Sequence, residues 1–217
     1  MLKSLAELDI SRTVIAELPD AIVNIKSLKV LKMNGSQMQK LPEAIGMLEK
    51  LEEIYGEDCK RLGMIPADIV RLPFLKTLKL TQTRMQNVPK LPQSLLSLCL
   101  SSTATAKAPE ISNLVNLRNL GLCFPSSTSV KYFPKANTYS PCCMLELPRI
   151  TSINSYLGCL GYLKELQLHN CRNLRQIGQL PSSLRKLTVQ NCNLLEVVDL
   201  SNLENLQLLL IYLSKTG

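Results

Sequence analysis

A short aliphatic pattern that recurs along the whole chain constrains its fold more than any other feature. In this pattern, LxxLxL, aliphatic residues stand at the first, fourth and sixth positions, as in Leu28, Leu31 and Met33. With degenerate copies included, ten repeats start at residues 5, 28, 51, 75, 95, 117, 142, 163, 184 and 206, at intervals of 20 to 25 residues. A fixed period of about 20–50 residues indicates a solenoid, in which each repeat closes its core only against its neighbours.

Each repeat has two halves that predict different backbone. In the LxxLxL half, alternate side chains point to one face of a strand, so successive strands stack into a parallel sheet with the leucines inward. The second half carries phrases such as LPEAIGMLEKL (residues 41–51), in which Pro42 ends the strand and favours a short helical turn. Ile45 and Leu48 follow at helical spacing and face the core.

The period and the two halves together predict an α/β solenoid. We expect a leucine-rich-repeat horseshoe of about ten repeats, with a parallel concave β-sheet and a convex side of short helical turns and loops, over residues 1–217 as one domain. The composition agrees with this prediction, because 46% of residues are hydrophobic and only 4% are aromatic, so leucine and other aliphatic residues must build the core.

The repeat breaks once, at residues 123–141, where Ser, Thr and Pro are frequent and the return phrase is missing. We interpret this segment as an irregular loop that leaves the solenoid and rejoins it near Cys142. Two interpretations stay open, a degenerate repeat and an inserted contact loop.

The charge pattern bears on which partners the chain binds. Twenty-five Lys and Arg against seventeen Asp and Glu give a net charge of +8, without a basic block or aromatic residues placed for stacking on bases. The charged residues Lys3, Glu7 and Asp9 interrupt the start of the chain, unlike in a secretory signal, and no apolar run approaches the ~20 residues of a membrane span. We therefore predict a cytoplasmic or nuclear location and neither nucleic acid nor membrane as a partner.

Residue types needed for catalysis are scarce. His169 is the single histidine, and the chain contains no glycine-rich phosphate-binding motif. Four acidic residues cluster near the third repeat, but lysines at matching positions of the neighbouring repeats predict a cross-strand charge ladder: Glu52, Glu53, Glu57 and Asp58. We predict no enzyme, and no catalytic, cofactor-binding or metal-binding residues.

The cysteines follow the repeat. Cys59, Cys171 and Cys192 occupy the ninth position of their repeats, where Thr13 and Thr83 stand in others. A small, weakly polar side chain can meet backbone groups of the turn there. Cys171 and Cys192 fall in adjacent repeats, so a disulfide is conceivable, but we favour buried reduced thiols of a cytosolic protein.

Three phrases resemble one family. LKLTQTRMQNVPKLPQSL (78–95), LHNCRNLRQIGQLPSSL (168–184) and DLSNLENL (199–206) resemble plant intracellular nucleotide-binding leucine-rich-repeat immune receptors of the Toll/interleukin-receptor-domain class. The resemblance implies a module that recognises pathogen effectors or guarded host proteins and contacts the receptor's own nucleotide-binding domain. Both end repeats lack a polar cap, so we expect a fragment without the nucleotide-binding and signalling domains.

Two other functions stay open. A free-standing cytosolic scaffold or adaptor in signalling would use the same repeat, and LGMIPADI (62–69) resembles a phrase of extracellular leucine-rich receptors. In each case we expect protein contacts at exposed concave strand positions, with no cofactor: Lys29, Lys32, Glu52, Glu53, Tyr55, Lys76, Lys79, Arg118, Lys164, Gln167, His169, Arg185 and Lys186.

Overall fold

A computed structural model describes residues 4–104, 111, 113, 114, 116, 117, 119–123, 142–146, 151–153 and 163–212, with the backbone alone for 142–146. The chain divides into two compact units, Met1–Thr105 and Ala106–Gly217, called here the N-terminal unit and the C-terminal unit.

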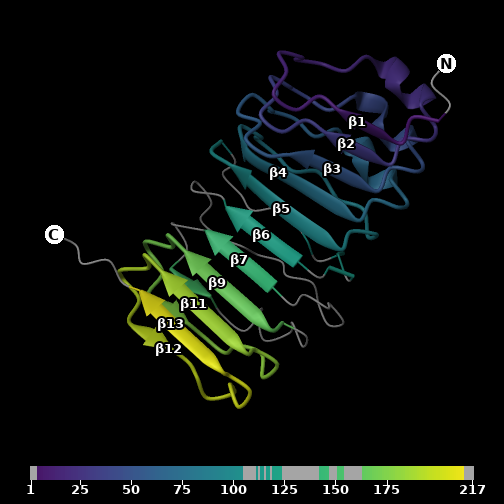
Figure 1. Cartoon of the computed structure of the whole chain (residues 1–217). Helices are drawn as coiled ribbons and strands as arrows, with labels where there is room; N and C mark the ends of the chain where they lie inside the picture. The colour runs from purple at the N-terminus through teal and green to yellow at the C-terminus, as the bar shows by residue number, and fades with distance from the viewer. Residues whose placement is uncertain are drawn as a thin grey trace. The chain divides into compact units, whose positions relative to one another are not determined.

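The N-terminal unit is built on five parallel strands (Figure 1): β1 (Glu7–Asp9), β2 (Val30–Lys32), β3 (Glu53–Gly56), β4 (Thr77–Thr83) and β5 (Ser97–Ser102). Consecutive strands pair in register, so the central aliphatic residue of each repeat falls in a single row: Leu8, Leu31, Ile54, Leu78 and Leu98. The last four of these side chains are almost completely buried, as the alternation predicts.

Short helical turns form the return side of this unit. They are the 3₁₀ segments η1 (Asp20–Asn24), η2 (Glu43–Met47) and η3 (Ala67–Arg71), and each follows a proline of the return phrase. Proline fixes φ near −65° and lacks an N–H, so it suits the residue before the first turn. The buried residues Ile22, Ile45 and Ile69 fix these turns to the core.

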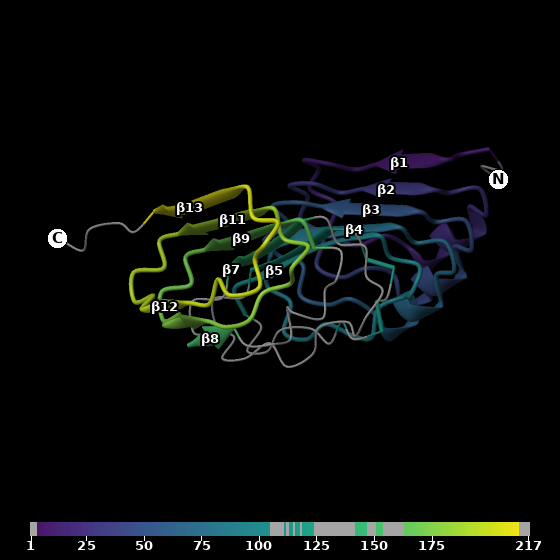
Figure 2. The same ribbon diagram turned by 90° about the horizontal axis from the view of Figure 1, so that it is seen from below.

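The C-terminal unit repeats the parallel arrangement with β6 (Asn119–Cys123), β7 (Cys142–Glu146), β9 (Glu165–His169), β11 (Lys186–Gln190) and β13 (Leu208–Tyr212). Its return side differs, because β8 (Ser152–Ile153), β10 (Gln176–Ile177) and β12 (Val197–Val198) form a second, three-stranded parallel sheet (Figure 2). β-branched Ile and Val favour extended backbone at these positions. The predicted helical turns are therefore confirmed in the N-terminal unit and replaced by strands here.

A glycine replaces the last aliphatic residue in the third repeat. The position of Gly56 is filled from neighbouring coils, since an added Cβ would lie 2.8 Å from Leu80 Cδ2 and 2.9 Å from Met33 Cε. The side chains of Leu80 and Met33 therefore fill the space that the missing aliphatic side chain of the third repeat leaves, and the core stays closely packed.

The predicted leucine-rich solenoid with a parallel sheet is confirmed, while the predicted number of repeats is slightly too high. The chain forms about seven turns. Apart from Cys123, the expected loop 123–141 lies outside the described residues.

One backbone position recurs from coil to coil. Each residue with positive φ in the described part of the chain stands at the eighth position of its repeat, after the strand or, for Gln82, near the end of β4: Arg12, Gly35, Asp58, Gln82, Asn170 and Asn191. Only Gly adopts this left-handed region without cost, and Asn and Asp tolerate it better than other residues.

Within the described residues, no helix is long and apolar enough to cross a membrane.

Candidate functional site

The outward strand positions of the N-terminal unit form an ordered polar surface, called here the N-terminal strand face. Because the strands are in register, its side chains fall into two rows. The first row contains Glu7, Val30, Glu53, Thr77 and Ser97, and the second contains Asp9, Lys32, Tyr55, Lys79 and Cys99. None of these ten side chains is fully buried, so the face is open to a partner.

A third row, just before the strands, alternates in charge. Backbone hydrogen bonds join Lys29, Glu52 and Lys76 in adjacent coils. Glu52 lies between the two lysines, with Oε2 2.6 Å from Lys76 Nζ and Oε1 3.3 Å from Lys29 Nζ. The hydrogen bonds from Lys76 and Lys29 lower the pKa of Glu52 below its ordinary value. The predicted charge ladder is therefore present at Glu52, although such exposed pairs contribute little stability.

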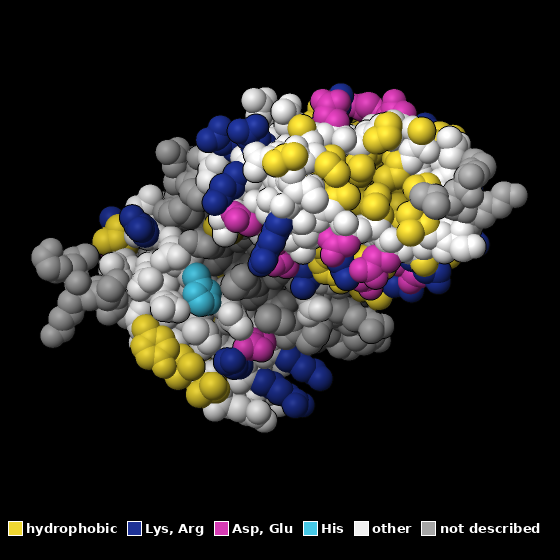
Figure 3. Space-filling view, turned by 45° about the horizontal axis from the view of Figure 1, so that its top comes forward, with side chains coloured by type: hydrophobic (Ala, Val, Ile, Leu, Met, Phe, Trp, Pro, Cys, Tyr) yellow, Lys and Arg dark blue, Asp and Glu magenta, His cyan; other side chains and the backbone are white. Residues whose placement is uncertain are grey.

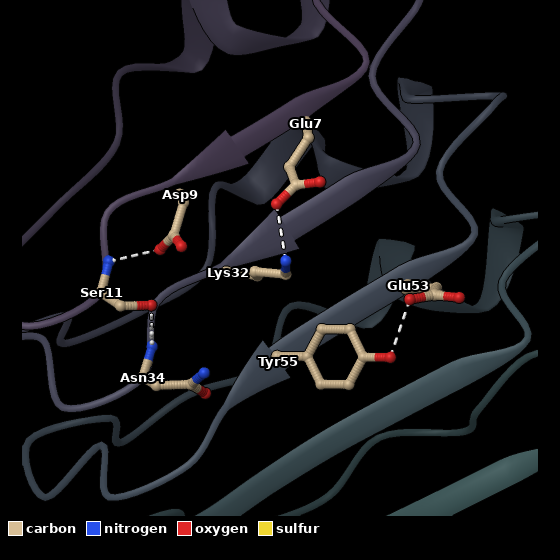
Figure 4. Close-up of polar contacts among 7 residues, drawn as sticks. All are labelled: Glu7, Asp9, Ser11, Lys32, Asn34, Glu53 and Tyr55. Atoms are coloured by element: carbon tan, nitrogen blue, oxygen red, sulfur yellow. Dashed lines mark hydrogen bonds and ion pairs between the residues drawn. The ribbon is translucent and has the colours of Figure 1, made fainter.

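The first two strands carry another fixed pair. Lys32 Nζ lies 2.6 Å from Glu7 Oε1, and this hydrogen bond raises the pKa of Lys32 (Figure 4). Asp9 accepts a hydrogen bond from the backbone N–H of Ser11 at 2.9 Å, and hydrogen bonds from Ser11 lower the pKa of Asp9. The polar atoms at this end of the face are thus held in defined positions.

Tyr55 occupies the middle of the second row and is held from two sides. Its hydroxyl donates a hydrogen bond to Glu53 Oε2 at 2.7 Å (Figure 4), and Lys79 Nζ lies 5.8 Å from the ring centroid. The hydrogen bond to Glu53 and, as a smaller cause, burial raise the pKa of Tyr55 to about 12. A rigid aromatic ring with a polar end is a side chain that protein interfaces favour.

The C-terminal unit presents a corresponding strand face. On β9, Glu165 Oε1 lies 2.5 Å from Lys186 Nζ and accepts a hydrogen bond from Gln167 Nε2 at 3.0 Å. The hydrogen bond from Lys186 lowers the pKa of Glu165. His169 lies at the end of β9, and its imidazole (cyan) is visible at the surface in Figure 3. His169 Nε2 itself is buried without a hydrogen-bond partner in the described part of the chain.

The structure groups the predicted contact residues by unit. Six of them lie together on or beside the N-terminal strand face, namely Lys29, Lys32, Glu52, Glu53, Tyr55 and Lys76, and Lys79 adjoins them over the Tyr55 ring. Five others lie on or beside the C-terminal strand face: Lys164, Gln167, His169, Arg185 and Lys186. Arg118 lies outside the described residues.

Several outward residues were not among the predicted contacts. Glu7 and Asp9 on β1, and Thr188 on β11, occupy the same rows as the predicted residues. The same alternation could have identified them, because each stands beside the central aliphatic residue of LxxLxL. The paired carboxylates also show that Lys29, Lys32 and Lys76 are not isolated cations.

The described side chains offer little for catalysis or metal binding. No group of three or more His, Cys, Asp or Glu in that part of the chain could hold a metal ion. The ninth-position cysteines are buried free thiols that contact backbone carbonyls of the turns, as Cys59 Sγ does with Met33 O at 3.0 Å. Burial raises the pKa of Cys59, whereas the hydrogen bond from Cys171 lowers that of Cys192. The arrangement suits binding by exposed, pre-positioned polar groups.

Comparisons with known proteins agree with this description. No family model matches the chain. Disease resistance protein RPS4 of Arabidopsis thaliana is 33% identical over 172 residues, which cover 79% of this chain and 12% of that protein. RPS4B is 26% identical over 80% of this chain, and Protein SUPPRESSOR OF npr1-1, CONSTITUTIVE 1 is 29% identical over 81%, both from the same plant. The chain thus spans only 12–14% of the length of these relatives.

A solved structure confirms the fold. The functional domain of InlJ from Listeria monocytogenes, which includes a cysteine ladder, matches with a TM-score of 0.56 and 16% identity. The match covers 96% of this chain and 42% of that one. At this identity the likeness concerns the solenoid fold alone.

Proposed function

We propose that this chain, a leucine-rich-repeat solenoid homologous over about 80% of its length to plant TIR-class NLR disease resistance proteins, is the protein-recognition module of an immune receptor. In this proposal the strand faces bind pathogen effectors or guarded host proteins. The nucleotide-binding and signalling domains of such a receptor lie outside this sequence, and the receptor's own nucleotide-binding domain is a second partner.

The observation that supports this proposal most is the N-terminal strand face. It presents carboxylates, ammonium groups, hydroxyls and the Tyr55 ring in register on a parallel sheet. Leucine-rich-repeat domains generally mediate protein–protein interactions. Side chains held by their neighbours lose little conformational freedom on binding, so more of the contact energy appears as affinity.

We also propose that the chain acts without catalysis and in the cytoplasm or nucleus. Several polar groups within each strand face form pairs of opposite charge, and none is arranged as a nucleophile with an adjacent base among the described residues. We propose that specificity comes from the combination of outward side chains, with no cofactor and no reaction.

A pair of charge-exchange variants tests the proposal. Glu53→Lys with Lys79→Glu changes the N-terminal strand face, and Glu43→Lys with Arg71→Glu changes the return side at η2 and η3. Both double variants keep the net charge, so non-specific association is matched. The chain and each variant are immobilised and exposed to extract of infected plant tissue, and bound proteins are quantified by mass spectrometry.

The proposal predicts proteins that the unchanged chain and the return-side variant capture equally and that the strand-face variant loses by about tenfold. Thermal unfolding of all three chains confirms equal folding. Equal capture by both variants, or loss only in the return-side variant, contradicts recognition by the strand face.

A further inference from the structure

The row of residues just before the strands differs sharply between the two units. In the N-terminal unit it reads Lys29, Glu52, Lys76, and the central carboxylate lies within 3.3 Å of both ammonium groups. In the C-terminal unit the corresponding residues are Lys164 and Arg185, which are both cations. They lie next to each other in adjacent coils, as the hydrogen bond from the Arg185 backbone N–H to Lys164 O at 2.8 Å shows.

These two cations are exposed and uncompensated. Adjacent parallel strands lie about 4.8 Å apart, and like charges directly opposite each other in a sheet are destabilising. Both side chains are exposed, and neither Lys164 nor Arg185 has a carboxylate within 4.0 Å among the described residues.

Three acidic residues of the C-terminal unit are held by residues other than Lys164 and Arg185. Residues 106–217 contain eleven Lys or Arg but only six Asp or Glu. Glu165 is held by Lys186 and Gln167, Glu196 Oε1 lies 2.6 Å from Arg175 Nη1, and Asp199 accepts hydrogen bonds from Ser201. The positive charge at Lys164 and Arg185 is therefore available to an outside group.

We propose that Lys164 and Arg185 form a docking point for an acidic segment of a partner protein, an inference that rests on the proposed recognition function. The Arg185 guanidinium can hold a carboxylate through two parallel N–H···O bonds, while the Lys164 ammonium supplies a compact positive charge. In an extended acidic segment, side chains on one face recur about every 6.8 Å, within reach of two long cationic side chains in adjacent coils. Complementary charge of this kind selects partners and speeds their encounter.

A peptide-binding experiment with matched variants tests the docking point. The probe is a fluorescein-labelled peptide, EAEAEAE, with QAQAQAQ as the neutral counterpart, and binding to the full chain is followed by fluorescence anisotropy at low and moderate salt. Lys164→Gln with Arg185→Gln removes the uncompensated pair. Lys29→Gln with Lys76→Gln removes two cations from the corresponding row of the other unit, so the change in net charge is identical.

The account predicts that the chain binds the acidic peptide and not the neutral one. The Lys164/Arg185 variant should lose affinity by about tenfold and show a weaker dependence on salt, whereas the Lys29/Lys76 variant stays within about twofold of the unchanged chain. Thermal unfolding curves of the two variants establish that both fold.

Three results overturn the inference: no binding of the acidic peptide, equal loss in both variants, and tighter binding of a single-stranded oligonucleotide than of the peptide at the same two residues. Each leaves the broader recognition function standing if the capture experiment distinguishes the strand-face variant. Conversely, peptide binding at Lys164 and Arg185 without any capture that depends on Glu53 and Lys79 preserves the docking point and contradicts recognition by the N-terminal strand face.

Discussion

The side-chain amide of Asn191 donates a hydrogen bond to Asn170 Oδ1 at 3.0 Å, and both residues have positive φ, at 56° and 53°. They stand at the eighth position of adjacent repeats, where the chain leaves the strand. Asn tolerates this backbone because its short polar side chain bonds locally, and here the two amides bond to each other. In the N-terminal unit the same position holds Arg12 and Gln82, which have no such advantage.

We predict that Gln82→Gly stabilises the chain. Gln82 has φ of 52° and an exposed side chain, so glycine removes the left-handed strain, while its backbone N–H keeps the hydrogen bond to Ser101 Oγ. The gain should be about 0.5–1 kcal/mol in the free energy of unfolding, measured by urea denaturation. Gln82→Ala, which keeps a Cβ, is the control, and an equal gain from alanine would contradict the explanation.

Gly46 in η2 should not tolerate a side chain. A Cβ there would lie 2.3 Å from the backbone oxygen of Asp68 in the next coil, and backbone cannot move away as a flexible side chain can. Gly46→Ala should therefore lower the free energy of unfolding by about 2 kcal/mol or more. Gly63→Ala is the matched control, since its nearest atoms lie at 3.9 and 4.0 Å, and a loss of the same size there would refute the argument from close approach.

The Tyr55 hydroxyl should lose its proton only at a pH above the ordinary tyrosine pKa. Because its hydroxyl donates to the Glu53 carboxylate, the phenol form is favoured and the pKa rises from 10.0 to about 12. A raised pKa means that this contact stabilises the fold fully below the unfolded pKa and stops doing so as the pH rises through the folded value. An ultraviolet titration of tyrosinate should lose a late transition in Tyr55→Phe and shift it downward in Glu53→Gln. A transition unaffected by Glu53→Gln would exclude this hydrogen bond as the cause.

The pairs made by Glu52 should depend on pH in the opposite sense. Lys76 and Lys29 lower the pKa of Glu52 from its ordinary value of 4.5, so the folded state favours the carboxylate. Its contribution is present above pH 4.5 and is lost as the pH falls through the lowered value. The melting temperature of Glu52→Gln should lie below that of the unchanged chain at neutral pH and converge with it in acid. A gap in melting temperature that persists in acid, or one that 0.5 M salt does not reduce, would contradict an electrostatic origin, because salt screens interactions between exposed charges.

The strands were predictable because one physical requirement recurs in most repeats. An aliphatic side chain such as Leu31 or Leu187 must face its counterparts in the neighbouring coils, and this requirement sets both the strand and its register. The ion pairs of Glu52 followed from the same register, since lysines precede the strands of both neighbouring repeats.

Other features depend on contacts that a single repeat does not reveal. The two-residue strands β10 and β12 carry almost no periodicity, and they are extended because each pairs with its neighbour in the stack. The left-handed backbone at Gln82 could not be predicted from the residue type, because Gln does not favour positive φ, whereas Gly35 and Asn170 at the same position of their repeats do. The uncompensated pair of Lys164 and Arg185 became visible only when the positions of Glu165 and Lys186 were known.

Site-specific photo-crosslinking tests the central claim, that the strand face recognises a protein, most directly. p-Benzoylphenylalanine is placed at Tyr55, in the middle of the N-terminal strand face, or at Phe74, an exposed aromatic residue that follows η3. Both sites already carry an aromatic ring, and at position 55 the probe also removes the hydroxyl that donates to Glu53. The account predicts that a captured protein partner crosslinks at position 55 and not at position 74. Crosslinking at position 74 alone would place the partner on the return side and contradict the account.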